Sequence, residues 1–423
     1  MSNAQGPQPT QPEKHDPYAA LRLPAYRHYV MGWFVLVLGQ QVQSVAVGWE
    51  MLNRTGSAFS LGIVGLMQAL PLLLFTLPAG AMCDRYDRRK IVLIASMVTA
   101  GSSVVLGFWS YAAGPVWLAY AALFVGGTAQ SIGWPARGAI MPTIVPRPLF
   151  PNAAAWNSSL FQVAAMTGPA LGGVIIAFSA PAAYFTYAAL TLVFLWQLVR
   201  LKGNFKPVRT EGKQGRVEEL LQGLRFVFRT KLILSAMTLD LMAVLLGGAA
   251  ALLPVYAKDI LHVDERGLGV LRSGEAVGAV AMALFLAYRK PFGKAGIAML
   301  WSVAGFGVAV IVFGLSTSFW LSFAMLVVMG ATDSVSVIVR NTLVTQLAPD
   351  AMRGRVNAVN TVFIGSSNDL GAFRAGSMAG LFGPVFSVVV GGVGTLASVL
   401  FVAWRWPELR KMGKLTEVKG EHE

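Results

Sequence analysis

Long apolar segments recur along nearly the whole chain and are separated by short polar stretches. Each segment is long enough to cross about 30 Å of hydrocarbon as a helix. The Gly and Pro residues inside them are compatible with helices in lipid, because neighbouring helices can satisfy the backbone groups that they expose. The pattern predicts an all-α membrane protein with twelve transmembrane helices, at 29–52, 58–82, 89–111, 115–141, 152–178, 181–201, 232–257, 265–288, 294–315, 318–346, 355–379 and 382–404.

The longest polar stretch between segments divides these helices into two groups of six. Within it, the sequence RVEELLQGLRFVF carries apolar residues at helical spacing, which predicts an amphipathic helix at the membrane surface; a solvated linker is the alternative. We expect a cytoplasmic N-terminal tail, an N-terminal six-helix bundle, a cytoplasmic linker, a C-terminal six-helix bundle and a cytoplasmic tail, at 1–28, 29–201, 202–231, 232–404 and 405–423.

The two groups of helices are related by an internal repeat. A shift of 203 residues, without gaps, pairs Arg137 with Arg340 and Asn157 with Asn360, and it also pairs several glycines and prolines. Because six helices separate the copies, both halves have the same orientation in the membrane. Two parallel six-helix halves about an axis along the membrane normal are typical of secondary transporters.

Composition and charge support a membrane location. Only 13% of the 423 residues are charged, whereas soluble domains carry about 25%. The net charge of +14 would suggest nucleic acid as a partner in a soluble protein. Here, 27 of the 34 Lys and Arg residues fall on one side when both termini are cytoplasmic, as the positive-inside rule requires. We expect a multi-pass protein of the bacterial inner membrane that contacts the lipid bilayer and no nucleic acid.

The sequence offers little for metal, disulfide or enzyme chemistry. Cys83 is the single cysteine, and the four histidines lie in tails or at segment ends, which argues against a disulfide framework and a Cys- or His-rich metal site. The chain contains no P-loop, HExxH or GxSxG motif. Residues 1–28 show no signal-peptide pattern. We expect no enzyme activity and no cofactor.

One loop carries a family signature. GAMCDRYDRRK, at 80–90, resembles the G-x-x-x-D-R-x-G-R-R/K signature of the major facilitator superfamily, with Asp87 in the place of the second Gly. A glycine there permits close helix approach. The resemblance implies that the loop latches the two halves in an outward-facing state; a basic loop that serves only topology is the alternative. The matching residues are Gly80, Asp84, Arg85, Arg88 and Arg89.

A second motif points to the direction of transport. TGPALGG, at 167–173, is similar to the signature of the antiporter branch of this superfamily, through Gly168, Pro169, Gly172 and Gly173. Small residues allow close helix packing and Pro disrupts the backbone ladder, so ordinary glycine-rich packing is the alternative. Over residues 20–405, the chain most resembles the bacterial enterobactin-exporter group.

The resemblance implies a small-molecule transporter that works by alternating access. We expect proton-coupled export from the cytoplasm by a monomer, with a siderophore-like substrate favoured. A multidrug proton antiporter is the first alternative. An uptake symporter is a second, because the fold does not encode direction, and a receptor or scaffold that does not transport is a third.

Ionisable residues inside the predicted helices are the candidates for proton coupling. Each costs about 2.5–3.5 kcal/mol on insertion scales and is a functional-site hypothesis by default. A carboxylate in a low dielectric is disfavoured in its charged form, so it could bind a proton in one conformation and release it in another. Structural ion pairs between helices are the alternative. The candidates are Asp240, Glu275, Asp333 and Asp369.

The arginines inside the helices call for partners. Arg137 and Arg340 lie near the cytoplasmic ends, where we expect backbone carbonyls or loop acids to bind them. Arg272 and Glu275 are three residues apart, so they can pair on one helix face. Asp369 and Arg374 point in different directions, so each needs a partner on another helix.

Neutral amides and one arginine are the candidates for substrate contact. Amides could bind a polar substrate without fixing its charge. They could equally connect helices, at about 0.6 kcal/mol each. The candidates are Gln40, Gln41, Gln43, Gln130, Asn157 and Arg374.

Overall fold

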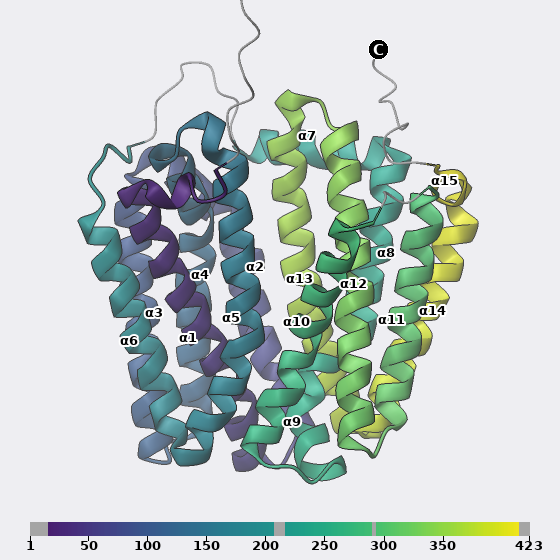
Figure 1. Ribbon diagram of the computed structural model, residues 1–423. Helices are drawn as coiled ribbons and strands as arrows, with labels where there is room; N and C mark the ends of the chain where they lie inside the picture. Colours follow the sequence, from purple (N-terminus) through teal and green to yellow (C-terminus); the bar gives the residue numbers. More distant parts are fainter. Residues whose placement is uncertain (1–15, 207–215, 290–292, 414–423) are drawn as a thin grey trace, which may run out of the picture.

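The computed structural model describes residues 16–206, 216–289 and 293–413, and all regular elements of these residues are helices. The predicted all-α fold is therefore confirmed. Most of the predicted N-terminal tail, the part of the linker at 207–215 and the last part of the C-terminal tail lie outside the described residues. Figure 1 shows two helical bundles side by side, one from each half of the chain.

Six long helices form the N-terminal half. They follow a short 3₁₀ turn at Ala20–Arg22 and include a second turn at Arg147–Leu149. The helices are α1 (Pro24–Thr55), α2 (Ala58–Arg85), α3 (Arg88–Tyr111), α4 (Val116–Ile144), α5 (Phe150–Phe178) and α6 (Ala180–Arg200).

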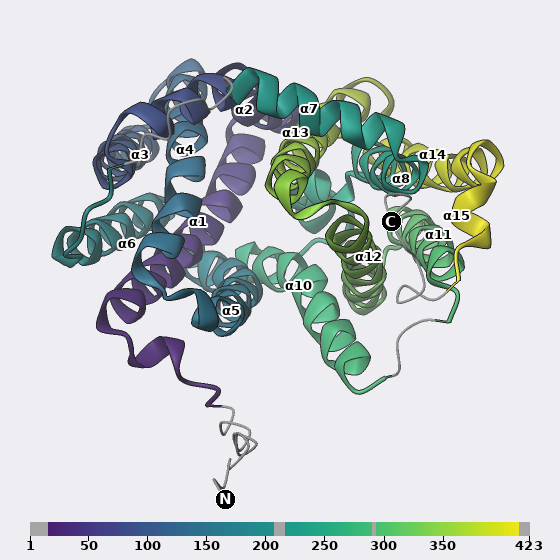
Figure 2. The ribbon, with the colours of Figure 1, turned by 90° about the horizontal axis from the view of Figure 1, so that it is seen from above.

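The linker contributes helix α7 (Arg216–Arg229), which Figure 2 shows lying across one end of α13 and α8. The C-terminal half then contains α8 (Lys231–Gly247), a 3₁₀ segment (Ala249–Leu252), α9 (Leu253–Val255), a π-helical turn (Tyr256–Ile260), α10 (Glu265–Ala287), α11 (Ala295–Leu315), α12 (Phe319–Leu347), α13 (Asp350–Phe382), α14 (Pro384–Arg405) and α15 (Pro407–Lys411). We call the end that carries α7 and α15 the linker end, and the opposite one the far end.

Eleven helices of the described chain are long and apolar enough to cross a membrane. The predicted helix at 355–379 corresponds to α13, which is longer than its prediction but more polar than the others, because it contains Asn368, Asp369 and Arg374. It packs against α2, α8 and α14. Much of its surface therefore faces protein, which is why a helix with these residues can accompany the eleven apolar ones.

The predicted helix at 232–257 is interrupted. Its α-helical part ends at Gly247, and Gly248 has ψ near 55°, outside the helical range. The chain continues through 3₁₀, α and π turns to Ile260. Adjacent glycines bear no Cβ to resist this change of direction. The predicted span is present, at Lys231–Ile260, but it is not one continuous α-helix.

The repeat is visible in the helix boundaries. Helix α12 begins and ends 203 residues after α4, at 319 against 116 and at 347 against 144. Arg137 and Arg340 therefore occupy the same place on equivalent helices, seven residues before the end of each.

The halves meet most closely at the far end. Helix α2 packs against α13, and α5 packs against α10. At both contacts glycines face each other: a Cβ on Gly173 would lie 3.1 Å from the Cα of Gly269, and a Cβ on Gly62 would lie 3.3 Å from the carbonyl carbon of Gly376. Small residues permit this approach of backbones.

Side chains also connect the halves at this end. The indole Nε1 of Trp49 donates to Glu265 at 3.0 Å, and the Nζ of Lys258 donates to Asn53 at 2.6 Å. Both bonds start near the end of α1; one reaches Glu265, the first residue of α10, and the other reaches Lys258 in the π-helical turn before α10. They fix the two halves against each other at the far end.

Candidate functional site

The C-terminal half contains a buried cluster of charged side chains. Arg340 of α12 forms an ion pair with Asp240 of α8, and only 2% and 8% of their side chains are exposed. Asp333, on α12, lies beside this pair and lines one cavity together with Asp240. The partner of Arg340 is therefore an acid inside a helix, and not the carbonyl or loop acid that the sequence led us to expect.

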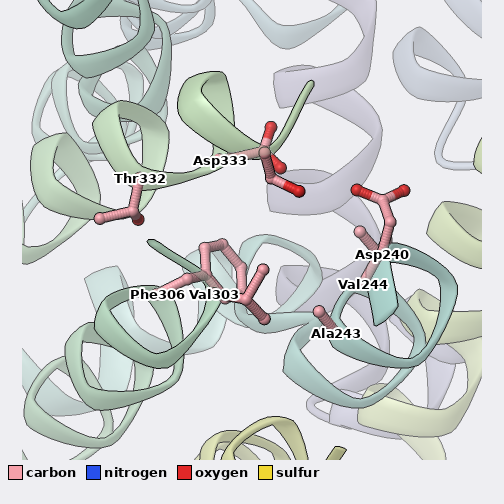
Figure 3. Close-up of a pocket in the computed structure, with 8 residues that line it drawn as sticks. Asp240, Ala243, Val244, Val303, Phe306, Thr332 and Asp333 are labelled. Carbon is pink, nitrogen blue, oxygen red and sulfur yellow. The ribbon is translucent and has the colours of Figure 1, made fainter. Parts of the chain in front are cut away.

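The cavity between these helices is small. In Figure 3 the carboxylates of Asp240 and Asp333 lie along one side of it, with Val303 and Phe306 of α11 along the other. Its volume is about 10 Å³, which is room for about one water molecule. Two carboxylates thus line this small space, and one of them, Asp240, also pairs with the guanidinium of Arg340.

The other two candidate acids do not take part in the Asp240–Arg340 ion pair, although Glu275 is close enough to Asp333 to interact with it electrostatically. Glu275 is half-buried on α10; Arg272 donates to the hydroxyl of Ser44 on α1 at 2.7 Å and forms no ion pair with Glu275 within the described chain. The expected local pair is therefore not formed. The carboxylate of Asp369 is half-buried on α13 and contacts no hydrogen-bonding or ionic partner among the described residues. The backbone carbonyl oxygen of Asp369 lies against Gly65 of α2.

Arg374 binds the interrupted helix. Its Nε donates to the carbonyl of Leu245 at 2.9 Å, and a terminal nitrogen donates to the carbonyl of Leu246. These carbonyls belong to the last turn of α8, where a helix leaves its acceptors without partners. The guanidinium of α13 thus supplies donors to the break in α8, and it has its partner on another helix.

The candidate amides do not converge on one point. Gln40 of α1 donates to Gln130 of α4 at 3.3 Å, and Gln43 accepts from Ser103 of α3 at 2.8 Å. Gln41 packs against Gly168 of α5, and Asn157 is half-buried on the same helix. In this conformation the contacts of these amides connect helices within the N-terminal half.

The signature loop packs onto its own half. Asp87 caps α3, because its carboxylate accepts from the backbone N–H groups of Arg89 and Lys90 at 2.9 and 3.2 Å. Its φ of −60° is open to any residue, which explains why glycine is not required here. Arg88 donates to the carbonyl of Ala139 on α4, and Arg89 donates to that of Val199 on α6.

The remaining residues of the signature lie at the end of α2. Gly80 is buried, whereas Asp84 and Arg85 are exposed in the last turn of the helix. The role of this loop as a latch therefore stays a prediction.

The antiporter motif lies between the halves. Gly172 packs against Val42 of α1, and Gly173 packs against Gly269 of α10. A Cβ on Gly269 would also press on the carbonyl oxygen of Pro169. The motif thus contacts a helix of its own half and a helix of the other half, and larger side chains would separate them.

One buried acid escaped the sequence analysis. Glu50 is 7% exposed, pairs with Arg54 at 2.6 Å and accepts from the hydroxyl of Tyr184 at 2.9 Å. The guanidinium of Arg54 also lies 4.0 Å from the centroid of the Trp109 ring. The spacing of Glu50 and Arg54, four residues apart on a helix, is the signal that could have revealed the pair.

Two parallel helical halves joined by a linker, with buried charges between helices, define a major facilitator superfamily transporter. The family model described as "Transmembrane secretion effector" matches residues 15–418, and the chain belongs to this family. The protein is therefore an integral membrane transporter and not an enzyme.

Curated relatives and solved structures agree with this family. The chain is 26% identical over 390 residues to the "Enterobactin exporter EntS" of Citrobacter koseri, with 92% of this chain and 93% of the relative covered. It is 25% identical to the exporter of the same name from Escherichia coli over the same coverage.

Among solved structures, a bacterial homolog of the lysosomal transporter Spinster, in an inward-facing and occupied conformation, matches with a TM-score of 0.70 at 14% identity, covering 94% of this chain and 99% of that one. A D-xylose-proton symporter matches with a TM-score of 0.68 at 15% identity, covering 95% and 99%. At these identities the structures support the fold alone.

Proposed function

We propose that the protein exports small molecules from the cytoplasm by alternating access, driven by protons that move inward. A siderophore-like catecholate is the favoured substrate class. The relatives named as enterobactin exporters support this class. A lipophilic, drug-like compound is the alternative substrate within the same mechanism.

The cluster of Asp240, Asp333 and Arg340 carries the proposal. It holds two carboxylates and one guanidinium in a largely buried position. Excess buried charge is costly, and binding of a proton removes it. A proton that leaves the cluster in one conformation and returns in another would couple its movement to that of the substrate. Asp369 is the second candidate, because its carboxylate has no charged partner in the described part of the chain.

The contacts at the far end support alternating access. The bridges from Trp49 to Glu265 and from Lys258 to Asn53 hold the halves together there. If both termini are cytoplasmic, this conformation is closed to the outside. Export then requires these bridges and the glycine contacts of α2 with α13 to separate while the linker end closes.

Reconstituted protein can test the proposal. Purified protein in liposomes, with an imposed pH gradient, should accumulate enterobactin against its concentration gradient. Asp240→Asn, Asp333→Asn and Asp369→Asn should each be compared with Asp16→Asn, which changes a half-buried acid outside the helices. Gradient-driven transport should fall at one or more of the three positions, whereas downhill exchange should persist.

Two outcomes would contradict parts of the proposal. Transport that stays gradient-driven in all three variants would show that none of the three acids is the proton-coupling site. Transport of a lipophilic cation such as ethidium, without transport of enterobactin, would replace the substrate class with the alternative.

The orientation can be tested with single cysteines. In a Cys83→Ser background, a cysteine at Ala113, which is exposed in the turn after α3, should react with an impermeant maleimide added outside cells. A cysteine at Arg410 of α15 should react only after the membrane is opened. The reverse pattern would overturn the cytoplasmic placement of the termini.

A further inference from the structure

The N-terminal half contains a second cavity at the position equivalent to the first. Ala129, Gln130 and Gly133 of α4 line it. Their equivalents on α12, 203 residues later, are Thr332, Asp333 and Ser336, and these line the cavity of the C-terminal half. The two cavities are therefore copies of one feature of the repeat, and each has a volume of about 10 Å³.

The charges around the two cavities differ. Each half keeps the arginine, as Arg137 or Arg340. The acid that pairs with Arg340 is Asp240, which also lines the cavity of the C-terminal half. The same shift of 203 residues leads to Val37, and the residue of α1 that lines the second cavity is its neighbour Leu36; both are buried and apolar. The second acid, Asp333, is replaced by Gln130. The N-terminal half thus retains the guanidinium and lacks both carboxylates.

Aromatic rings are the main contacts of the Arg137 guanidinium. Its central carbon lies 5.3 Å from the ring centroid of Trp33 and 5.5 Å from that of Trp134. No acid of the described chain pairs with it, and its Nε is buried without a hydrogen-bond partner among the described residues. Ring faces attract a cation but carry no net charge. A counter-charge for Arg137 is therefore missing within the described protein.

The polar groups around this cavity are suited to bind an anion. The carbonyl oxygen of Gln130 accepts from Gln40, which leaves its NH₂ group to donate. Ser96 is buried on α3 and lines the cavity, and its hydroxyl forms no hydrogen bond with the described residues. By contrast, the hydroxyls of Thr99 and Thr191 donate to carbonyls of their own helices. A guanidinium, an amide NH₂ and a hydroxyl are all donors.

We propose that this cavity binds a single halide-sized anion, with chloride as the abundant occupant. The small volume, about 10 Å³, favours a monatomic ion over polyatomic anions such as carboxylates or sulfate. The anion supplies in the N-terminal half the negative charge that Asp240 supplies to Arg340 in the C-terminal half. This site does not depend on the substrate, the direction or the driving ion of transport.

Thermal unfolding of the purified full chain in detergent tests the site. Sodium isethionate is replaced stepwise by sodium chloride at constant ionic strength, so that only the anion changes. A ligand that binds the folded state raises Tm in a saturating manner. We expect a rise of a few degrees for the unaltered protein, and the same rise for Arg22→Gln, which changes an exposed arginine paired with Asp16.

Two variants separate a bound anion from a general salt effect. Arg137→Gln should abolish the chloride response. Leu36→Asp places a carboxylate in the lining of this cavity, on the helix equivalent to the one that carries Asp240, so it should also abolish the response while leaving the arginine in place. A bromide anomalous peak beside Arg137 in crystals grown from bromide would be the direct observation. An unaltered protein that does not respond to chloride, or a full response in both variants, would overturn the proposal.

Discussion

The guanidinium of Arg340 on α12 forms an ion pair with the carboxylate of Asp240 on α8, with 2% and 8% of the side chains exposed. The two residues are far apart in sequence, and each would be costly alone in a transmembrane helix. Together they connect two helices of the C-terminal half next to Asp333. The same ion pair therefore holds α8 against α12 and fixes the position of Asp240 in the proposed proton-coupling site.

Removal of the arginine from this pair should destabilise the protein strongly. Arg340→Gln leaves the Asp240 carboxylate buried without its partner, which costs about 3–5 kcal/mol in comparable pairs. Chemical unfolding of the detergent-purified protein should show this loss in the free energy of unfolding.

A double variant separates the ion pair from packing. Asp240→Asn combined with Arg340→Gln removes both charges, so its loss should be smaller than that of Arg340→Gln alone. Arg22→Gln, at an exposed pair, should change stability by about 0–1 kcal/mol. Equal losses in the single and the double variant would mean that the charge of Asp240 is not what the arginine compensates.

For the stability of the protein, the two hydrogen bonds that the Arg374 guanidinium donates should be more important than its positive charge. Arg374→Lys keeps the positive charge, but a single ammonium cannot reproduce the two bonds to the carbonyls of Leu245 and Leu246. We expect a loss of about 1.5–3 kcal/mol, typical of hydrogen bonds to charged groups.

The matched control is Arg405→Lys, since Arg405 lies at the exposed end of α14 and stacks beside Trp406. Unfolding free energies of the two variants should differ. Equal effects would show that Arg374 acts as a simple positive charge.

The positions of the helices could be predicted from local sequence pattern, whereas the ion pairs and hydrogen bonds between helices could not. Apolar length predicted the helices, and the ungapped repeat placed Arg137 and Arg340 at equivalent positions before the fold was known. The partner of Arg340 depended on how α8 and α12 rotate about their axes, which no spacing along one helix reveals. The interruption at Gly248 was not predicted for a related reason. The donors that satisfy the carbonyls at the end of α8 belong to Arg374 of α13, which is far away in the sequence.

The same limit applies to the candidate sites. Arg272 and Glu275 have the right spacing for a pair, yet Ser44 of the other half binds the arginine. In contrast, Glu50 and Arg54 do pair, and their spacing contained the signal. Local geometry therefore permits a pair, and tertiary contacts decide whether it forms.

A surface pair at the linker end gives a prediction for pH. Hydrogen bonds from its own backbone N–H and from Lys231 lower the pKa of Glu408. Because the pKa of Glu408 is lowered, the folded state binds a proton at this carboxylate less tightly than the unfolded state does. The pair therefore contributes its full stability above the ordinary glutamate pKa of about 4.3, and this contribution is lost as the pH falls through the lowered pKa. The difference in Tm between the unaltered protein and Glu408→Gln should therefore be present at neutral pH and vanish in acid. A difference that is constant over this range would contradict the assignment.

The glycine contact between α2 and α13 should control which conformation the protein adopts. A Cβ on Gly376 would collide with the backbone of Gly62 and lie 3.0 Å from the carbonyl oxygen of Ala58. Gly376→Val should therefore disfavour the closed far end by about 1–3 kcal/mol, the range for overpacked sites. Gly101→Val makes the same change on α3, where no atom lies within 4 Å, and is the matched control.

In a Cys83→Ser background, a cysteine that replaces the buried Leu61 of α2 reports the opening of the far end, because its reaction with maleimide should accelerate only in Gly376→Val. Equal labelling rates in the two valine variants would show that this contact does not hold the far end closed.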